Sequence, residues 1–312
     1  MKKISIVIPC FNESESTHIF YKNICGVLNQ LKNKFNFEII FIDDGSSDDT
    51  LQKLIKITLK DERFKLLELS RNFGKEAALT AGLAYSTGDA LIVIDADLQD
   101  PTYLIPSMID HWVRGADVVL AKRTDRGTDT FIKRATAKLF YKFYNLISPV
   151  KIPEDVGDFR LMDKAVIDVI NLMPEKNRFM KGIFAWVGFK SITIEYKRES
   201  RAMGKTKFSG WRLWNLAIEG ITSFSSIPLR VWSYVGIIGS LFSIFYGCVI
   251  IFKTLVLGID VPGYASLLVS ILFIGSLQLM GLGILGEYIG RIYEETKRRP
   301  SYVVRKMYGF KK

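Results

Sequence analysis

Two aspartates separated by one residue, Asp95 and Asp97, carry the most recognisable chemistry in this sequence. They follow the apolar run 90–94, which is typical of a buried strand, and a buried pair of carboxylates is costly unless a cation meets it. Hard divalent cations bind carboxylate oxygens together with substrate phosphates. The pattern predicts a metal site for a nucleotide diphosphate, although an isolated Asp-x-Asp also fits a polar turn.

Three more polar groups each follow a predicted strand or fall in a loop: Asn12-Glu13, Asp43-Asp44-Gly45-Ser46 and Gly157-Asp158-Phe159-Arg160. Open α/β sheets bind ligands beyond the carboxyl ends of their strands. We therefore expect these groups and the stretch 95–100 to share one rim of the sheet. Within the second group, Asp43 is expected to cap the turn before a helix near Ser46, which leaves Asp44 as the better ligand.

The elements that must position these residues are predicted from hydrophobic periodicity. Apolar segments at 4–9, 37–42, 64–69, 90–94 and 116–121 predict strands, and their unbroken apolar character favours parallel strands covered on both faces. Between them, apolar residues at 24–31 and 51–59 recur at helical spacing. The predicted class is a Rossmann-like α/β domain. No GxGxxG turn follows the first strand, which disfavours a dinucleotide-binding dehydrogenase.

The C-terminal third predicts membrane helices. Residues 231–252 and 264–285 contain no charged side chain, and each run is long enough to cross a bilayer. We expect two spans at about 231–256 and 264–288 within a segment 230–290, after a domain at 1–208 and a juxtamembrane amphipathic helix at 209–229. Residues 291–312 are expected to form a basic tail. The flanking arginines and lysines predict that both termini are cytoplasmic.

Composition narrows the range of molecules that this chain is expected to bind. The 312 residues carry a net charge of +11, which suits anionic lipid and phosphate substrates. A basic amphipathic helix is predicted at 130–147, and it suits either the membrane interface or an ordinary protein surface. The basic residues cluster near the membrane segments without a nucleic-acid motif, so nucleic acid is not an expected partner. The three cysteines lack metal-ligand spacing, and neither histidine lies in a catalytic pattern.

Several longer motifs carry a family resemblance over the whole chain. They are Ile8-Pro-Cys-Phe-Asn-Glu13, Phe41-Ile-Asp-Asp-Gly-Ser46, Arg71-Asn-Phe-Gly-Lys-Glu76, Asp95-Ala-Asp-Leu-Gln-Asp-Pro101, Ala121-Lys-Arg123, Val156-Gly-Asp-Phe-Arg-Leu-Met162, Gly204-Lys-Thr-Lys-Phe208 and Leu285-Gly-Glu-Tyr-Ile-Gly-Arg291. The chain resembles inverting family-2 glycosyltransferases of GT-A fold that act on polyprenyl phosphates. Within that family it is similar to bactoprenol glucosyltransferases of the O-antigen-modification type and, more distantly, to dolichol-phosphate mannose synthases.

The resemblance implies roles for individual residues. Those implied to hold the nucleotide sugar are Pro9, Glu13, Asp44, Lys75 and Asp95; those for Mg²⁺ or Mn²⁺ are Asp95, Asp97 and Gln99; those for the acceptor phosphate are Arg123, Lys133, Arg134 and Arg201. Asp44 is expected to accept from the base, either uracil or guanine, and Lys75 either meets a phosphate or is solvated.

The resemblance also nominates Asp158 as the general base. A phosphate monoester is largely dianionic near pH 7, since its second pKa is about 6, so a base finds little proton to remove. Orienting the acceptor, contacting a sugar hydroxyl or neutralising Arg160 are therefore alternatives.

The expected enzyme transfers glucose from UDP-glucose to undecaprenyl phosphate in the bacterial cytoplasmic membrane, for surface (O-antigen-type lipopolysaccharide) modification. Its partners would be a UDP-sugar, the acceptor lipid, the membrane and a separate flippase, with self-association through glycines in the spans as an option. A GDP-mannose or UDP-amino-sugar donor is the alternative within the enzyme class. A non-catalytic membrane scaffold is the alternative outside it. A processive synthase is disfavoured because the chain lacks a Gln-x-x-Arg-Trp motif.

Overall fold

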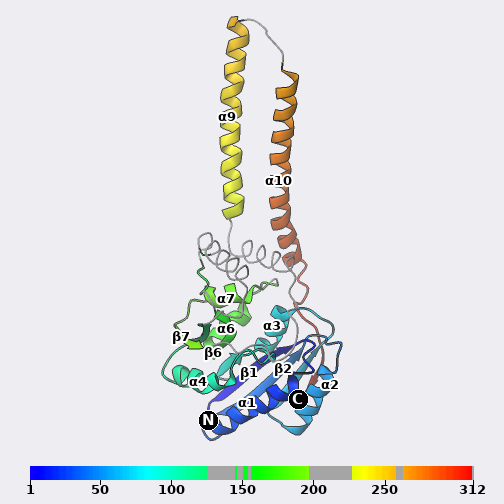
Figure 1. Cartoon of the computed structure of the whole chain (residues 1–312), viewed down its shortest axis with the longest axis vertical. Helices are drawn as coiled ribbons and strands as arrows, with labels where there is room; N and C mark the ends of the chain where they lie inside the picture. Colours follow the sequence, from blue (N-terminus) through cyan, green and yellow to red (C-terminus); the bar gives the residue numbers. More distant parts are fainter. Residues whose placement is uncertain are drawn as a thin grey trace.

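The computed structural model consists of an α/β domain from which two long helices project (Figure 1). It describes residues 1–124, 145, 150–153, 156–176, 178–196, 227–257 and 263–310. The expected helix at 130–147 falls almost wholly outside these ranges. The expected helix at 209–229 does too, apart from its last residues, which open the first long helix.

One sheet organises the α/β domain. Its strands in the described chain are β1 (Lys3–Cys10), β2 (Asn36–Asp43), β3 (Phe64–Leu69), β4 (Ala90–Val93), β5 (Val118–Arg123), β6 (Val156–Asp163), β7 (Ser191–Tyr196) and β8 (Val304–Tyr308), in the spatial order β7-β5-β6-β4-β1-β2-β3-β8. The pairs β1–β2, β1–β4, β2–β3 and β5–β7 are parallel, whereas β6 runs antiparallel to β4 and β5, and β8 runs antiparallel to β3. The predicted class, an α/β domain with a mainly parallel sheet, is confirmed.

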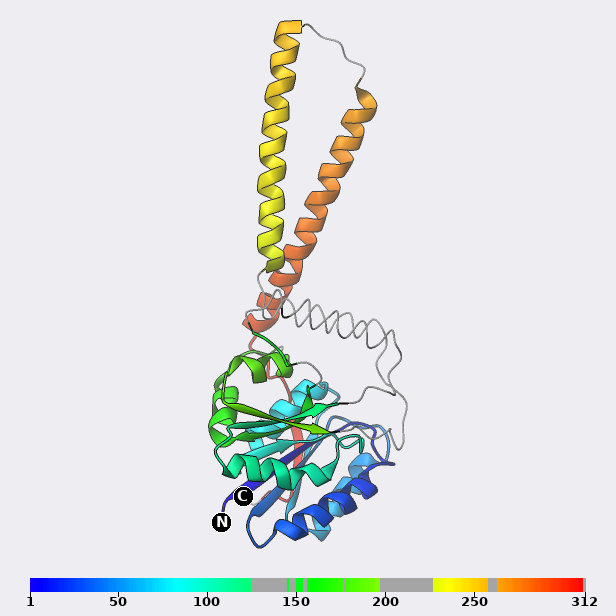
Figure 2. The same ribbon diagram turned by 60° about the vertical axis from the view of Figure 1, so that its left-hand side comes forward.

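Helices cover both faces of this sheet (Figure 2). One face packs against α1 (Thr17–Leu31), α2 (Thr50–Lys60) and α4 (Ile105–Val113). A short 3-10 helix, η1 (Thr102–Leu104), precedes α4. The other face packs against α3 (Lys75–Tyr85), α6 (Lys164–Leu172) and α7 (Met180–Trp186). The predicted periodic segments 24–31 and 51–59 lie in α1 and α2. The sheet is therefore the middle layer of three, which explains why its strands are apolar on both faces.

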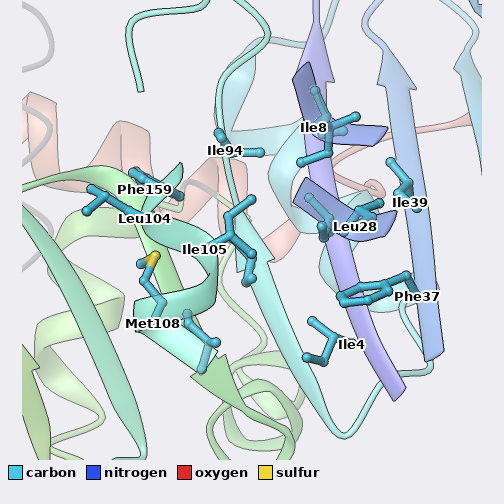
Figure 3. Close-up of a cluster of buried hydrophobic side chains, with 14 of the residues drawn as sticks. Ile4, Ile8, Leu28, Phe37, Ile39, Ile94, Leu104, Ile105, Met108 and Phe159 are labelled. Atoms are coloured by element: carbon cyan, nitrogen blue, oxygen red, sulfur yellow. The ribbon is translucent and has the colours of Figure 1, made fainter. Parts of the chain in front are cut away.

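Alternation along the strands divides the core in two. Ile4, Ile6 and Ile8 of β1 face the α1 and α4 side, whereas Val7 faces α3. Figure 3 shows Ile4 and Ile8 packed among side chains from β2, α1 and α4. All four side chains are fully buried, and each contributes about 1.5–3 kcal/mol of transfer free energy. This packing holds the ends of the central strands, and hence the polar rim, in fixed positions.

The two projecting helices are α9 (Ile227–Leu257) and α10 (Tyr264–Thr296). Both are long and apolar enough to cross a membrane, with candidate spans Leu229–Ile250 and Ser266–Thr296, and the protein itself buries almost none of their apolar surface. Large apolar side chains such as Phe242, Leu255 and Phe273 are more than 60% exposed. Such an apolar surface requires another covering, and lipid is the covering that a 30-residue helix fits.

The segment expected as a basic tail is structured. Residues 291–296 continue α10, and β8 then joins the sheet as the edge strand next to β3. Tyr308 donates a hydrogen bond to Glu68 (3.0 Å), and the ring of Phe310 lies 5.9 Å from that of Tyr85. This strand was not predicted, because charged residues at 305 and 306 hide its alternation. The boundary expected at residue 208 therefore leaves out one strand of the sheet.

Removing residues 301–312 is expected to destabilise the α/β domain, because the edge of β3 would be exposed and the packing of Phe310 would be lost. We expect the melting temperature to fall by at least about 5 °C and soluble aggregates to appear. Thermal melts of the detergent-solubilised protein would test this, with a chain lacking only residues 311 and 312 as the control. Equal melting temperatures for both truncations would contradict it.

Candidate active site

The sheet topology brings the predicted rim residues together. Strands β1, β2 and β4 are parallel, so Glu13, Asp44 and Asp95 follow strand ends at one edge of the sheet. The N–H of Asp44 donates to the carbonyl of Cys10 (2.9 Å), and the N–H of Ile94 donates to Val7 (3.1 Å). These bonds extend the strand pairing up to the rim.

Asp158 reaches the same rim by a different route. We expected it in a loop or after a strand, but it lies inside β6, near the start of that strand. Because β6 runs antiparallel to β4, with Arg160 opposite Val93, its first residues lie beside the residues that follow β4. Asp158 and Asp95 therefore become neighbours although 62 positions separate them in the chain.

Lys75 connects these two aspartates. Its ammonium nitrogen lies 2.7 Å from a carboxylate oxygen of Asp95 and 2.6 Å from one of Asp158. Lys75 is the first residue of α3, and Gly74 before it has φ = 98°, a conformation that favours glycine. The side chain is 40% exposed, yet it is held between two carboxylates. This arrangement does not fit a freely solvated lysine.

Asp44 organises the loop that leads to Lys75. Its two carboxylate oxygens accept hydrogen bonds from the N–H groups of Phe73 (2.7 Å) and Gly74 (2.9 Å), and its carbonyl accepts from the amide of Asn72 (3.1 Å). Burial of the carboxyl group raises its pKa, and the two N–H donors act in the opposite direction. Asp44 thus has a structural role in addition to its predicted contact with the base.

The loops after β1 and β2 are tied to each other. The N–H of Glu13 donates to the hydroxyl of Thr50 (2.8 Å), and the N–H of Ser47 donates to the side chain of Asn12 (2.8 Å). Asp43 accepts from the N–H of Ser46 (3.2 Å), so its predicted capping of this turn is confirmed. Pro9 lies within β1, one residue before the strand ends.

Asp97 and Gln99 form a tight turn after β4. The N–H of Gln99 donates to Asp97 (3.1 Å), and Leu98 between them has φ = 63°. The next residue, Asp100, is buried and accepts a hydrogen bond from the hydroxyl of Tyr196 (2.8 Å). That hydroxyl accepts in turn from Nε of Arg123 (3.2 Å), so this chain of bonds holds Arg123 at the end of β5.

Burial and neighbouring charges shift the pKa values at this rim. Burial alone would raise the pKa of Asp158, but Lys75 and then Lys181 outweigh it and hold the pKa well below its usual range. Burial, and then Asp158, raise the pKa of Glu76 to about 8. Burial, and then Asp95, raise the pKa of Asp100 to about 6. Asp158 is therefore ionised at neutral pH, which makes it a weak base.

Glu76 and Tyr196 are site residues that were not predicted from the sequence. Glu76 accepts a hydrogen bond from the N–H of Met180 (3.3 Å) at the start of α7, and this bond ties α3 to α7 behind Asp158. Its position directly after Lys75 could have indicated it, whereas no local pattern marks Tyr196. The predicted acceptor residues Lys133, Arg134 and Arg201 lie outside the described residues, and their roles remain predictions.

Replacing Glu76 with glutamine is expected to stabilise the protein as the pH rises. The folded pKa of about 8 lies above the ordinary value of 4.5, so stability is fully present below pH 4.5 and is lost as the pH rises towards 8. Glutamine can still accept from Met180 and never ionises. We expect a melting temperature about 2–5 °C above wild type at pH 8 and little difference near pH 4.5. A gain that does not depend on pH would contradict this explanation.

The residues present fit a divalent cation held jointly with substrate phosphates. No cluster of three or more His, Cys, Asp or Glu suited to a metal occurs among the described residues. Asp95 nevertheless directs its carboxylate oxygens at one cation, the ammonium group of Lys75, and Asp97 follows in the same turn. Magnesium sites at phosphate substrates commonly use one or two carboxylates, with the remaining ligands from phosphate and water.

The α/β domain, with its mainly parallel sheet and an acidic rim at its strand ends, has the architecture of a glycosyltransferase of GT-A type. The model of the family described as glycosyl transferase family 2 matches residues 5–170, more than half of the chain, so the chain belongs to that family and is a glycosyltransferase.

Curated relatives match nearly the full length. The SfII prophage-derived bactoprenol glucosyl transferase of Shigella flexneri is 54% identical over 97% of this chain and 98% of its own length. The prophage bactoprenol glucosyl transferase homolog of Escherichia coli K12 is 53% identical, over 98% of this chain and 99% of its own length. Among solved structures, mannosyl-3-phosphoglycerate synthase from Rubrobacter xylanophilus is 16% identical, with a TM-score of 0.48 over 70% of this chain and 71% of its own.

Proposed function

We propose that this glycosyltransferase moves glucose from UDP-glucose to undecaprenyl (bactoprenyl) phosphate, with inversion at the anomeric carbon. The observation that carries the proposal is the identity of 53–54% to bactoprenol glucosyl transferases over 97–98% of the chain, which includes both apolar helices as well as the acidic rim. Two long apolar helices that the protein leaves unburied also favour an acceptor held in a membrane.

On this proposal, Pro9, Glu13 and Asp44 hold the nucleotide, because the tied loops after β1 and β2 form the part of the rim next to Asp95. A divalent cation on Asp95 and Asp97 would stabilise the negative charge that develops on the departing diphosphate. Lys75 supplies a fixed positive charge at the same place, between Asp95 and Asp158. No acidic proton donor is then needed on the leaving side.

The acceptor provides its own nucleophile. A phosphate oxygen of the lipid forms the new bond to the anomeric carbon, and the bond from that carbon to the diphosphate oxygen breaks. The lipid phosphate is largely dianionic at neutral pH. Asp158, with its pKa held low and its carboxylate paired with Lys75, is a poor proton acceptor. We therefore assign Asp158 to orienting Lys75 and the acceptor.

The membrane part of the proposal follows from the acceptor. A polyprenyl tail stays in the bilayer, so an enzyme anchored beside it works at high effective concentration. We propose that α9 and α10 cross the bacterial cytoplasmic membrane and that the catalytic domain and both termini face the cytoplasm. A flippase would then present the glucosyl lipid for modification of a surface polysaccharide.

One experiment tests donor, acceptor and metal together. Membranes containing the full chain would be incubated in turn with labelled UDP-glucose, UDP-galactose and GDP-mannose, and label extracted into organic solvent would be counted. We expect extractable label from UDP-glucose only, lost with EDTA and regained with Mg²⁺ or Mn²⁺. Label from GDP-mannose instead would overturn the donor assignment, and no label from any donor would favour a scaffold.

A further inference from the structure

A cavity of about 150 Å³ lies on the α7 side of the sheet, outside the rim described above. Strands β5 and β6, helix α7, the segment 151–153 and the start of β7 enclose it; the lining residues used below are Lys151, Arg160, Lys181, Phe184, Ala185 and Phe189. Most of the wall is apolar, and the charged side chains among its described residues are all cationic. This combination suits an amphiphilic anion.

Arg160 is the most telling residue of this wall. It is 5% exposed, and its guanidinium lies 4.0 Å from the centre of the Phe184 ring. One terminal nitrogen donates to the carbonyl of Gly157 (2.7 Å), whereas Nε has no hydrogen-bond partner in the described part of the chain. No carboxylate forms an ion pair with Arg160 within the described ranges. A buried cation in this state is costly, and a bound anion would relieve that cost.

The cavity adjoins the reacting end of the site. Arg160 follows Asp158 by two positions in β6, so both side chains lie on the same face of the sheet, the face covered by α3 and α7. Lys181 of α7 also acts on Asp158 through its charge. Arg123, by contrast, reaches Tyr196 and Asp100 and lies against the position of a Cβ on Gly157, which is on the opposite face.

The cavity is also close to the apolar helices. Helix α7 follows a loop in which the N–H of Lys176 donates to Glu295 (3.0 Å), in the last turn of α10. Figure 1 shows α7 on the side of the domain from which α9 and α10 project. A ligand with a membrane-embedded tail therefore approaches the domain on the side where this cavity lies.

We infer that this cavity binds the phosphate-bearing end of the isoprenoid acceptor, with phosphate oxygens on Arg160 and Lys181 and the first isoprene unit against Phe184 and Phe189. The inference rests on the proposed function and extends it to residues outside the expected acceptor set. A divalent cation does not suit this cationic wall, and a whole nucleotide is too large for the volume. Arginine binds phosphate oxygens in a bidentate manner, and lysine adds a mobile charge.

Steady-state kinetics of the full chain in detergent would test this, with UDP-glucose as donor and farnesyl phosphate or undecaprenyl phosphate as acceptor. Lys181→Met removes a proposed phosphate contact, and Ala185→Leu fills the cavity. Lys190→Met changes an exposed lysine on the loop before β7 and serves as the matched control. We expect the acceptor KM to rise at least tenfold in the first two variants and to stay within twofold in the control, with donor KM unchanged in all three.

Arg160→Met separates binding from folding. Burial lowers the pKa of the Arg160 guanidinium more than the charges of Asp158 and Glu76 raise it, so its charge is a net cost to the fold, and methionine can keep an apolar contact with Phe184. We expect a melting temperature no lower than that of wild type, together with a raised acceptor KM. An acceptor KM within twofold of wild type for both Lys181→Met and Ala185→Leu would overturn the inference. A wild-type protein that glucosylates neither lipid phosphate would instead refute the proposed function.

Discussion

Replacing Asp97 with asparagine is expected to reduce sugar transfer at least about 100-fold, which corresponds to about 2.7 kcal/mol of lost transition-state stabilisation. Asparagine keeps the oxygen that accepts from the N–H of Gln99, so the turn after β4 is expected to persist. What it loses is the negative charge that a hard cation requires at this position. Transfer of label from UDP-glucose to the lipid fraction would measure the loss.

The matched control is Asp110→Asn. Asp110 is exposed and lies in the last turn of α4, after the rim stretch 95–100 in the sequence. This substitution removes the same charge without affecting the site, so transfer is expected to stay within twofold of wild type. The melting temperatures of both variants should match the parent. Full activity of Asp97→Asn over a titration of Mn²⁺ would show that this carboxylate does not hold a catalytic cation.

Replacing Lys75 with methionine is expected to have an effect of similar size and to change the pH dependence. The variant leaves Asp95 and Asp158 facing each other without their shared cation. In the wild type, burial raises the pKa of Asp158, but the charge of Lys75 outweighs it, so the group is ionised over the whole working range. Without Lys75, burial is expected to raise this pKa, and transfer should then fall as the pH drops through the new value.

Profiles of kcat/KM between pH 5 and 9 would check this second prediction. We expect at least about a 100-fold loss at neutral pH, in the range that removal of one fixed electrostatic group from an active site produces. Lys56→Met, which changes an exposed lysine of α2, is the control and should keep the wild-type profile. A Lys75→Met profile with the wild-type shape, merely scaled down, would mean that Lys75 does not set the ionisation of Asp158.

The central strands could be predicted because their signal is local. Residues 4–9, 37–42 and 64–69 are short apolar runs bounded by polar residues, and each coincides with a strand to within two residues. The acidic groups after β1, β2 and β4 follow from the same reasoning, since parallel strands end at one edge of a sheet. The length and apolar character of α9 and α10 are likewise properties of the chain alone.

Antiparallel additions to the sheet could not be predicted in this way. Strand β6 carries Asp158 and Arg160 among apolar residues, and β8 carries charged residues, so neither shows clean alternation. Their places depend on open strand edges presented by β4, β5 and β3, which exist only once the rest of the sheet has formed. The edge strand β8 is joined to β3 by backbone hydrogen bonds, which leave little mark on the choice of side chains.

By itself, the sequence determined which residues could hold phosphate, metal and lipid, because those capacities belong to side-chain type and local spacing. Only the tertiary structure decided that Lys75 meets Asp95 and Asp158, that Glu76 ties α3 to α7, and that Arg160 lines a cationic cavity beside the site. These are contacts between segments far apart in the chain, whose distances are set by the order and direction of the strands. The sequence alone shows which side chains are charged, whereas the order and direction of the strands determine which oppositely charged group lies next to each of them.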